Sequence, residues 1–271
     1  MRQDQIDAYA PSEIALRVEA AGEAKAHTAL HKTFILAVLA GSFIAFGALF
    51  YIVVTTNSGL GFGPERLLGG LAFSLGLILI VVGGAELFTG NILMVFAWAD
   101  KKIRFSEVLK SWSVVYAGNL VGAAATAYMV YLTGVHNLAS GGVGETAAKI
   151  ASTKADLSAL QAFTRGILCN VLVCLAVWLS FSARTVPGKV CAIVFPIAGF
   201  VAMGFEHSIA NMFFFPFGYL TGAGVVTLQT ALFNLFFVTA GNLIGGGFLV
   251  GLVYWLVYGR SSQSARKQKD T

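Results

Sequence analysis

The sequence predicts an all-α integral membrane protein, with six transmembrane helices arranged as two inverted three-helix repeats. Composition is the first indication, because 57% of the 271 residues are apolar and 11% are charged, whereas soluble domains carry roughly 25% charged residues. The second indication is a set of six apolar runs, each near or above the ~20 residues that a helix needs to cross a bilayer. Polar residues that recur inside two of these runs are the third.

A polar segment, residues 1–32, precedes the apolar runs. Ile14 and Val18 lie at helical spacing among Glu, Arg and Lys residues, which predicts an amphipathic helix over 11–32 at the cytoplasmic surface. The segment lacks the basic tip and short apolar core of a cleaved secretory signal. A membrane domain is expected over 33–258 and a basic cytoplasmic tail over 259–271. The six predicted spans are 33–55, 67–98, 111–133, 162–182, 190–217 and 228–258.

Charges between the spans predict the orientation. Six spans place both termini on one side of the membrane, and cytoplasmic loops carry an excess of Lys and Arg. Fourteen of the 18 Lys and Arg residues fall in the N-terminal segment, the second and fourth loops and the tail. Both termini are therefore predicted to be cytoplasmic, in a bacterial-type inner membrane. The net charge of +5 is attributed to this topology and not to nucleic-acid binding, because no basic stripe or binding module accompanies it.

The second and fifth spans are predicted to be broken helices. The run over 67–98 would extend ~48 Å as a straight helix, against a hydrocarbon core of ~30 Å. It contains Glu86, and the similarly long run over 190–217 contains Glu206 and His207. Irregular backbone at membrane depth is tolerated only where protein or a cavity satisfies its polar groups. Both breaks are therefore expected to line a pathway.

Two pairs of motifs indicate an internal repeat, over about 33–133 and 162–258. The pairs are ELFTGN at 86–91 with EHSIAN at 206–211, and GNLVG at 118–122 with GNLIG at 241–245. The offsets are 120 and 123 residues. Because each half contains three spans, the second half enters the membrane in the opposite sense. Inverted repeats with interrupted helices indicate a substrate path near the midplane, where half-helix N-termini favour an anion.

The segments GGAELFTGN and GFEHSIANMFFFP are similar to the two signature segments of the formate/nitrite transporter family, and the second resembles its formate branch. The resemblance covers essentially the whole chain. It implies an aquaporin-like fold, a homopentamer with one pore per protomer, and a pathway for formate or a related small monovalent anion. Nitrite is the first alternative substrate, followed by hydrosulfide, acetate and lactate.

The resemblance also implies roles for individual residues. The stretch 87–89 is similar to a mobile break in the second span of the family, with Thr89 facing a central histidine, His207. The implied substrate pathway consists of Thr89, His207, Asn170, Asn211 and the outer-vestibule Lys154. The implied constrictions are Leu77 toward the cytoplasm, Phe73, Phe88 and Phe200 toward the outside, Leu87 in the mobile break and Val173 beside the central site. The surroundings of Lys154 depart from the formate pattern.

Two pairs of polar residues are predicted to support the breaks. Matching carboxylates at Glu86 and Glu206 are expected to accept hydrogen bonds from the backbone N–H groups that each break exposes. Asn119 and Asn242 are expected to pack helices together or to hydrogen-bond the breaks, and not to contact substrate.

The chemistry expected at the centre follows from charge. A carboxylate at membrane depth is costly, by ~2.5–3.5 kcal/mol on the insertion scale. His207 is the one histidine predicted within a span, and an imidazole can carry a proton near neutral pH. A small carboxylic acid titrates near pH 4, so a proton from the histidine would give a neutral acid that can pass apolar rings. We hypothesise that Lys154 attracts the anion, Thr89 and His207 bind or protonate it, and Asn170 and Asn211 orient it. Simple anion conduction is the alternative.

Other function classes fit the sequence less well. A neutral-solute channel for water or glycerol would use the same architecture, but the chain lacks paired Asn-Pro-Ala boxes. An intramembrane enzyme is not expected, because there is no H-E-x-x-H metal motif and no nucleophile with a base. Three cysteines without metal-ligand spacing are predicted to be packing residues. No metal or cofactor is expected.

Overall fold

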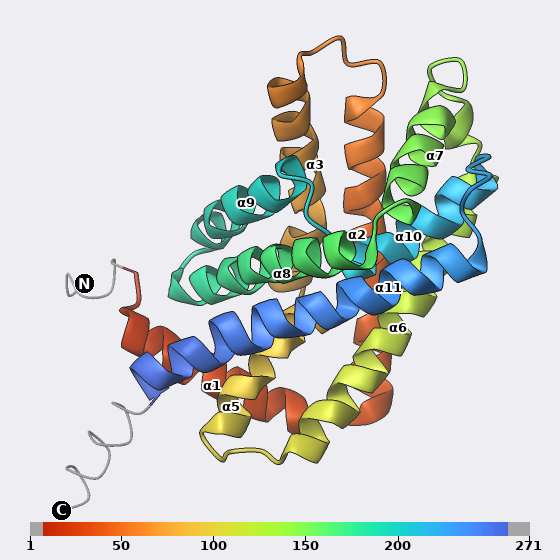
Figure 1. Cartoon of the computed structure of the whole chain (residues 1–271). Coiled ribbons are helices and arrows are strands. Elements are labelled where there is room, and N and C mark those ends of the chain that lie inside the picture. The colour runs from red at the N-terminus through yellow and green to blue at the C-terminus, as the bar shows by residue number, and fades with distance from the viewer. Residues whose placement is uncertain (1–7, 260–271) are drawn as a thin grey trace, which may run out of the picture.

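A computed structural model describes residues 8–259, and its described residues form helices without strands. Figure 1 shows the spans crossing one another as a bundle, with α7 and the α2–α3 loop at one end and α1 and α5 at the other. Among residues 8–259, five helices are long and apolar enough to cross a membrane, and three shorter apolar helices accompany them. The first half contains α1 (Pro11–His27), α2 (Leu30–Thr55), α3 (Phe62–Gly83), α4 (Phe88–Asn91), η2 (Ile92–Met94), α5 (Val95–Ala99) and α6 (Phe105–Leu132). The second contains η3 (Val135–Asn137), α7 (Gly142–Ala155), α8 (Ala159–Ser182), α9 (Val186–Ala202), α10 (Ser208–Leu220), α11 (Leu228–Leu243), η4 (Ile244–Leu252) and η5 (Trp255–Gly259).

Both predicted interruptions are present. The second span consists of α3 followed by α4 to α5, and the fifth consists of α9 followed by α10. The sixth span runs from Leu228 to Gly259 with π-type turns in its second half. The N-terminal helix ends at His27, earlier than the predicted residue 32, because Thr28 and Ala29 adopt extended backbone before α2 begins. Most of the predicted tail lies outside the described residues.

The repeated glycine motifs make the closest helix crossings in each half. In the first half, a Cβ atom on Gly122 would collide with the carbonyl oxygen of Val38, so α6 crosses α2 at backbone distance. In the second half, a Cβ on Gly245 would collide with the carbonyl oxygen of Ile167 on α8. Small residues permit this approach between helices in a membrane, where association depends on close packing. Close backbone contacts at these glycines therefore hold the third span against the first and the sixth span against the fourth.

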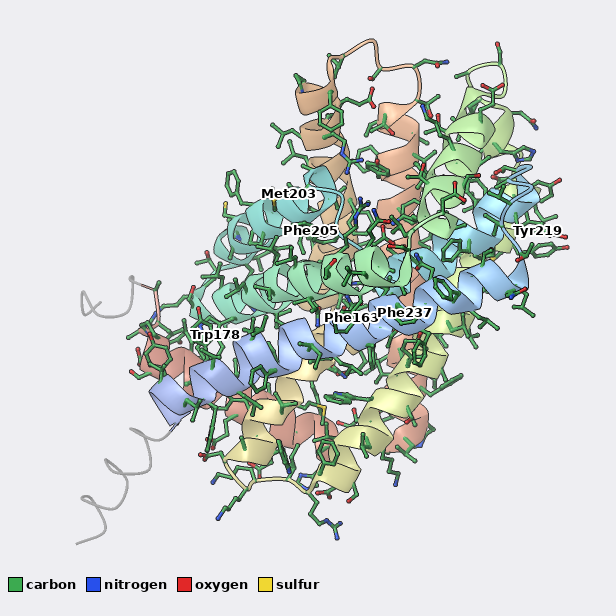
Figure 2. The ribbon with its side chains drawn as sticks, viewed as in Figure 1. Phe163, Trp178, Met203, Phe205, Tyr219 and Phe237 are labelled. Atoms are coloured by element: carbon green, nitrogen blue, oxygen red, sulfur yellow. The ribbon has the colours of Figure 1, made fainter. Side chains whose placement is uncertain are left out.

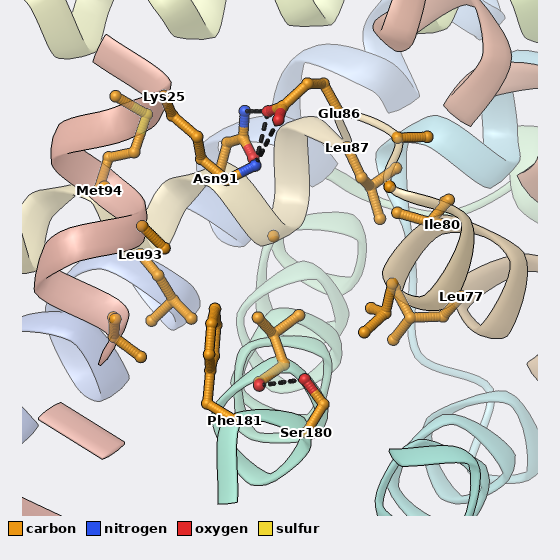
Figure 3. A pocket seen from close by; sticks show the side chains of 18 of the residues that line it. Lys25, Leu77, Ile80, Glu86, Leu87, Asn91, Leu93, Met94, Ser180 and Phe181 are labelled. Carbon is orange, nitrogen blue, oxygen red and sulfur yellow. Dashed lines mark hydrogen bonds and ion pairs between the residues drawn. The ribbon is translucent and has the colours of Figure 1, made fainter. Parts of the chain in front are cut away.

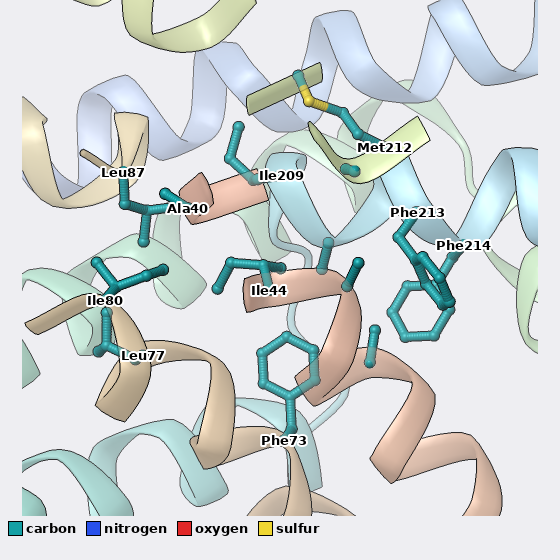
Figure 4. Packing of buried hydrophobic residues seen from close by; sticks show 14 of the residues in the cluster. Ala40, Ile44, Phe73, Leu77, Ile80, Leu87, Ile209, Met212, Phe213 and Phe214 are labelled. Carbon is teal, nitrogen blue, oxygen red and sulfur yellow. The ribbon is translucent and has the colours of Figure 1, made fainter. Parts of the chain in front are cut away.

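Two apolar clusters position the elements around the breaks. The larger cluster joins α2, α3 and α10, and Figure 4 shows Ile44, Phe73 and Leu77 packed within it. The smaller cluster docks α1, since Ile14 and Val18 pack with residues that include Trp178 of α8. Figure 2 shows Trp178 beside the start of α1, and Phe163 and Phe237 where α8 crosses α11. The N-terminal helix is thus part of the folded body.

Candidate functional site

The first break spans residues 84–87. Gly84 ends α3 with a φ of 84°, a left-handed conformation that glycine adopts without strain. Leu87 is the N-cap of α4 and its side chain makes no capping bond. Asn119 of α6 bridges the gap: its Oδ1 accepts from the N–H of Phe88 at 2.9 Å, and its Nδ2 donates to the carbonyl of Glu86 at 2.9 Å. The break is therefore tied to α6 by one amide side chain.

The second break spans residues 203–207 and repeats this scheme. Gly204 has a φ of 74° at the end of α9. Asn242 of α11 accepts from the N–H of Ser208 at 3.0 Å and donates to the carbonyl of Glu206 at 3.0 Å. The N-cap of α10 is His207, whose side chain accepts a hydrogen bond from the N–H of Ala210. Only the second break thus has a capped half-helix.

Each break carries a Glu–Asn pair with a lysine, and both members of the pair are buried only in the second half. Glu86 accepts from Lys25 at 2.7 Å and from Asn91 at 2.6 Å, as Figure 3 shows. The corresponding carboxylate in the second half is that of Glu206, which accepts from Lys154 at 2.8 Å and from Asn211 at 2.7 Å. The glutamates were expected to accept hydrogen bonds from backbone N–H groups, and this expectation is wrong. The donors to the glutamates are instead the side chains of Asn91, Asn211 and the two lysines. The backbone N–H groups donate to Asn119 and Asn242.

Lys25 is a site residue that the sequence reasoning missed. It lies on α1 and pairs with Glu86 at the first break, so it is the counterpart of Lys154, which pairs with Glu206. A signal was present in the sequence, because Lys25 is seven residues after Val18. That spacing places a cation on the same face of the helix as a core residue. A lysine on the buried face of an amphipathic helix indicates a partner carboxylate, which here is Glu86.

The centre of the molecule holds Thr89 and His207, which lie 2.9 Å apart between Oγ1 and Nε2. Both are buried, with 0% and 2% exposure. Because Nδ1 of His207 accepts from the N–H of Ala210 at 3.1 Å, a neutral imidazole carries its proton on Nε2. The ring then donates to Thr89 Oγ1, and the threonine hydroxyl keeps its own hydrogen for another acceptor. This pair can donate one hydrogen bond to an anion without changing protonation.

The side-chain amides of Asn170 and Asn211, which neighbour this pair, mainly form hydrogen bonds within the protein. Nδ2 of Asn170 donates to the carbonyls of Thr89 at 3.3 Å and Asn242 at 2.8 Å. Nδ2 of Asn211 donates to Glu206 and, at 2.8 Å, to Asn234 Oδ1. Among the described residues, Oδ1 of each of these two amides has no partner. Asn170 thus links α4, which follows the first break, to the sixth span, and Val173, one turn along α8, is buried beside it.

Two cavities approach the centre from opposite ends. The cavity beside α1, named the inner cavity after the predicted orientation, has a volume of about 240 Å³ and is lined by Leu77, Leu87, Glu86 and Lys25 among others (Figure 3). The outer cavity, about 560 Å³, is lined by the aromatic residues Phe73 and Phe200, by His207, by Arg66, Lys149, Lys154 and Arg165, and by Glu65 and Glu206. No described residue lines both cavities, and Thr89 lines neither, so the two cavities are separate.

The leucine and phenylalanine residues predicted to form constrictions lie beside the two cavities, with one difference. Leu77 and Leu87 lie on the inner side, and the rings of Phe73 and Phe200 meet at 5.7 Å between centroids on the outer side. Phe88 was expected to join that outer pair. Its ring contacts instead lie on α6, and it lines neither cavity among the residues described.

Comparison with known proteins identifies the family. The model of the family described as formate/nitrite transporter matches residues 12–256. This chain belongs to the formate/nitrite transporter family. It is 42% identical to the formate channel FocA of Escherichia coli K12, over 94% of this chain and 96% of that protein. It is also 39% identical to a probable formate transporter of Methanothermobacter thermautotrophicus, over 92% of this chain and 96% of the relative.

Solved structures of the formate/nitrite transporter family share the fold. A pentameric formate channel with formate bound is 42% identical, covers 84% of this chain and 97% of its own, and superposes with a TM-score of 0.78. An FNT family ion channel at 26% identity covers 90% of this chain and 98% of its own, with a TM-score of 0.83. The predicted aquaporin-like arrangement with broken second and fifth spans is confirmed. The protein is a membrane channel or transporter and not an enzyme.

Proposed function

We propose that this protein conducts formate and related small monovalent anions through a pathway centred on Thr89 and His207. The observation that carries the proposal is a buried hydroxyl–imidazole pair between two cavities, each of which bears a lysine. The names of the relatives support formate as the substrate. Nitrite is the first alternative, and acetate, lactate and hydrosulfide follow. A neutral-solute channel is the competing class.

An anion that enters the outer cavity is attracted by Lys154, one of the cations that line it. The outer cavity holds four cationic and two acidic side chains, which favours an anion. Lys154 is already paired with Glu206 at 2.8 Å, so the anion competes with a carboxylate for the ammonium group. On the inner side, Lys25 stands in the same relation to Glu86. We propose that each lysine attracts the anion and that its glutamate limits how tightly the anion is held.

At the centre, the hydroxyl of Thr89 donates to the anion while His207 orients that hydroxyl. Proton transfer to the substrate needs a further step. The Nε2 proton can leave only if the ring first gains a proton on Nδ1, the atom that now accepts from Ala210. Proton-linked transport therefore requires the α10 cap to open, whereas simple anion conduction leaves it closed. Leu77 and Leu87 on one side, and Phe73 and Phe200 on the other, exclude ions until the break moves.

We further propose a homopentamer in a bacterial-type inner membrane, with both termini cytoplasmic. A solved relative that is named pentameric supports the assembly. The excess of Lys and Arg in the N-terminal segment, the second and fourth loops and the tail supports the orientation. The domain organisation that goes with this proposal is a cytoplasmic N-terminal helix within 1–32, a channel domain over 33–258 and a cytoplasmic tail over 259–271.

The proposal is tested in liposomes that contain the protein and an internal pH dye. Pulses of formate, nitrite, acetate and glycerol are compared for the native protein, His207→Ala and His31→Ala. His31 is exposed at the start of α2, which makes it a matched control for a lost histidine. We expect fast formate-driven acidification in the native protein and the control, and its loss in His207→Ala.

Each alternative predicts a different trace. Formate current without acidification supports simple anion conduction, and equal rates for His207→Ala and the native protein remove the proton-donor role of His207. Transport of nitrite without formate moves the substrate assignment to the nitrite branch. If glycerol alone enters, the anion hypothesis fails.

A further inference from the structure

The first break rests on a stripe of three side chains along one face of α6. Trp112, Tyr116 and Asn119 are spaced by four and three residues, which places them side by side on a helix. Asn119 binds the backbone on both sides of Leu87, as described above. The two aromatic residues of the stripe contact Phe88, the first residue of α4.

Phe88 is seated edge-on against both aromatic side chains. Its ring centroid lies 4.9 Å from that of Tyr116 at 77° and 6.3 Å from that of Trp112 at 74°. These are the T-shaped arrangements that aromatic pairs favour. The indole Nε1 of Trp112 also donates to the carbonyl of Asn91 at 3.0 Å. Residues 88–91 are therefore held at their first side chain and at their last carbonyl.

The second break lacks these aromatic contacts. At the repeat offset of 123, positions 112, 116 and 119 correspond to Leu235, Thr239 and Asn242. The asparagine is retained and the aromatic pair is not. Position 88 corresponds to Ser208, which has no ring to hold. Tyr116 and its counterpart Thr239 contact each other at 2.9 Å between hydroxyl oxygens, which anchors the stripe to α11.

We propose that Trp112 and Tyr116 form an aromatic latch that holds the first break closed through Phe88. Release of Phe88 from α6 is then the step that joins the inner cavity to the centre. The inference rests on the proposed function, since it assumes that a pathway opens through this break. It assigns Phe88 to the latch and not to the outer constriction, and it gives the two α6 residues a positioning role.

The test measures hydrogen exchange of backbone amides in the full-length protein in detergent, without formate. The variants are Phe88→Leu, Trp112→Leu and Tyr116→Leu, with Tyr128→Leu as the matched control. Tyr128 is an aromatic residue on α6 that is 56% exposed, away from the break. Since one aromatic pair contributes roughly a two- to tenfold factor to an equilibrium, we expect amides over 84–94 to exchange faster by about that factor. Amides over 203–212 and the control variant should keep native rates.

A double variant and a transport assay sharpen the result. Phe88→Leu combined with Tyr116→Leu should exchange little faster than either alone, because both break the same contact. The three latch variants should also take up formate faster than the control. Unchanged exchange over 84–94 would overturn the latch, as would accelerated exchange over 203–212 to the same extent, which indicates general loosening.

The constriction reading of Phe88 makes a different prediction. A smaller side chain at 88 would then raise formate flux without changing exchange, and Trp112→Leu would change neither, which would overturn the latch. If exchange rises as expected while neither the native protein nor any variant moves formate, the latch stands and the proposed function fails.

Discussion

The two helix breaks are copies of one design, and they differ in how firmly they are held. Both have a glycine with positive φ, a Glu–Asn–Lys group, and an asparagine from the last span of their own half. The second break has in addition an N-cap, from His207, and a guanidinium, from Arg66. The first break has Leu87 at the cap position and aromatic contacts from α6.

Arg66 shows the difference most directly. Its Nη2 donates to the carbonyl of Val201 at 2.7 Å and its Nε to that of Ala202 at 2.9 Å, at the end of α9. A cation at a helix C-terminus stabilises the free carbonyls there. No arginine among the described residues makes such bonds to the carbonyls that end α3. The hydrogen-bonded second break is therefore expected to be the fixed wall of the pathway, and the first break its moving part.

The largest expected effect is on thermal stability, and it separates the lysines of the two breaks. Lys154 and Glu206 have side-chain exposures of 14% and 4%, against 29% and 15% for Lys25 and Glu86. Leaving a buried charge without its partner costs about 3 kcal/mol, whereas a more exposed pair contributes about 1 kcal/mol or less. Lys154→Met should therefore lower the thermal unfolding midpoint much more than Lys25→Met. Lys149→Met serves as the control, because Lys149 is an exposed cation that lines the same outer cavity as Lys154. An equal fall in the unfolding midpoint for all three variants would contradict the comparison.

Loss of the guanidinium should loosen the second break. Arg66→Gln removes the two charge-assisted hydrogen bonds to carbonyls of α9, which are together expected to contribute about 2 kcal/mol at this partly buried position, and a longer one to the Tyr51 hydroxyl. We expect amide exchange over 203–207 to rise toward that of the first break. Arg165→Gln is the matched variant, because Arg165 reaches the carbonyl of Gly204 at 3.5 Å only and should matter less. A larger effect at Arg165 would mean that the anchor has been misassigned.

The cap at His207 is expected to contribute less. His207→Ala removes the acceptor for the N–H of Ala210, which should destabilise the first turn of α10 by about 1 kcal/mol. Asparagine is a good N-cap, so His207→Asn should keep the slow exchange of that amide while it removes the titratable ring. Nitrogen NMR of the native imidazole should show the proton on Nε2. A proton on Nδ1 in the neutral ring would exclude the cap.

The sequence could predict what the two breaks share, but not the contacts by which they differ. Spans, orientation signals and both interruptions follow from composition, length and the repeated Glu and Asn residues. The partners of Glu86 and Glu206 did not follow, because a lysine on α1 or α7 reaches its carboxylate only after the helices pack. Phe88 likewise could be assigned only once α6 placed Tyr116 against it. Family resemblance located the central pair, but not which imidazole nitrogen is already occupied.

The smallest expected effect distinguishes the two glycines that end α3 and α9. Gly84 and Gly204 both have positive φ, so alanine at either position costs about 1 kcal/mol in backbone strain. A Cβ on Gly84 would meet nothing within 4 Å, whereas one on Gly204 would lie 3.1 Å from Nη2 of Arg66. Gly204→Ala should therefore lower the unfolding midpoint slightly more than Gly84→Ala. In an Arg66→Gln background the excess should disappear if it arises from the displaced guanidinium; an excess that persists there would place its cause in the backbone and not in the anchor.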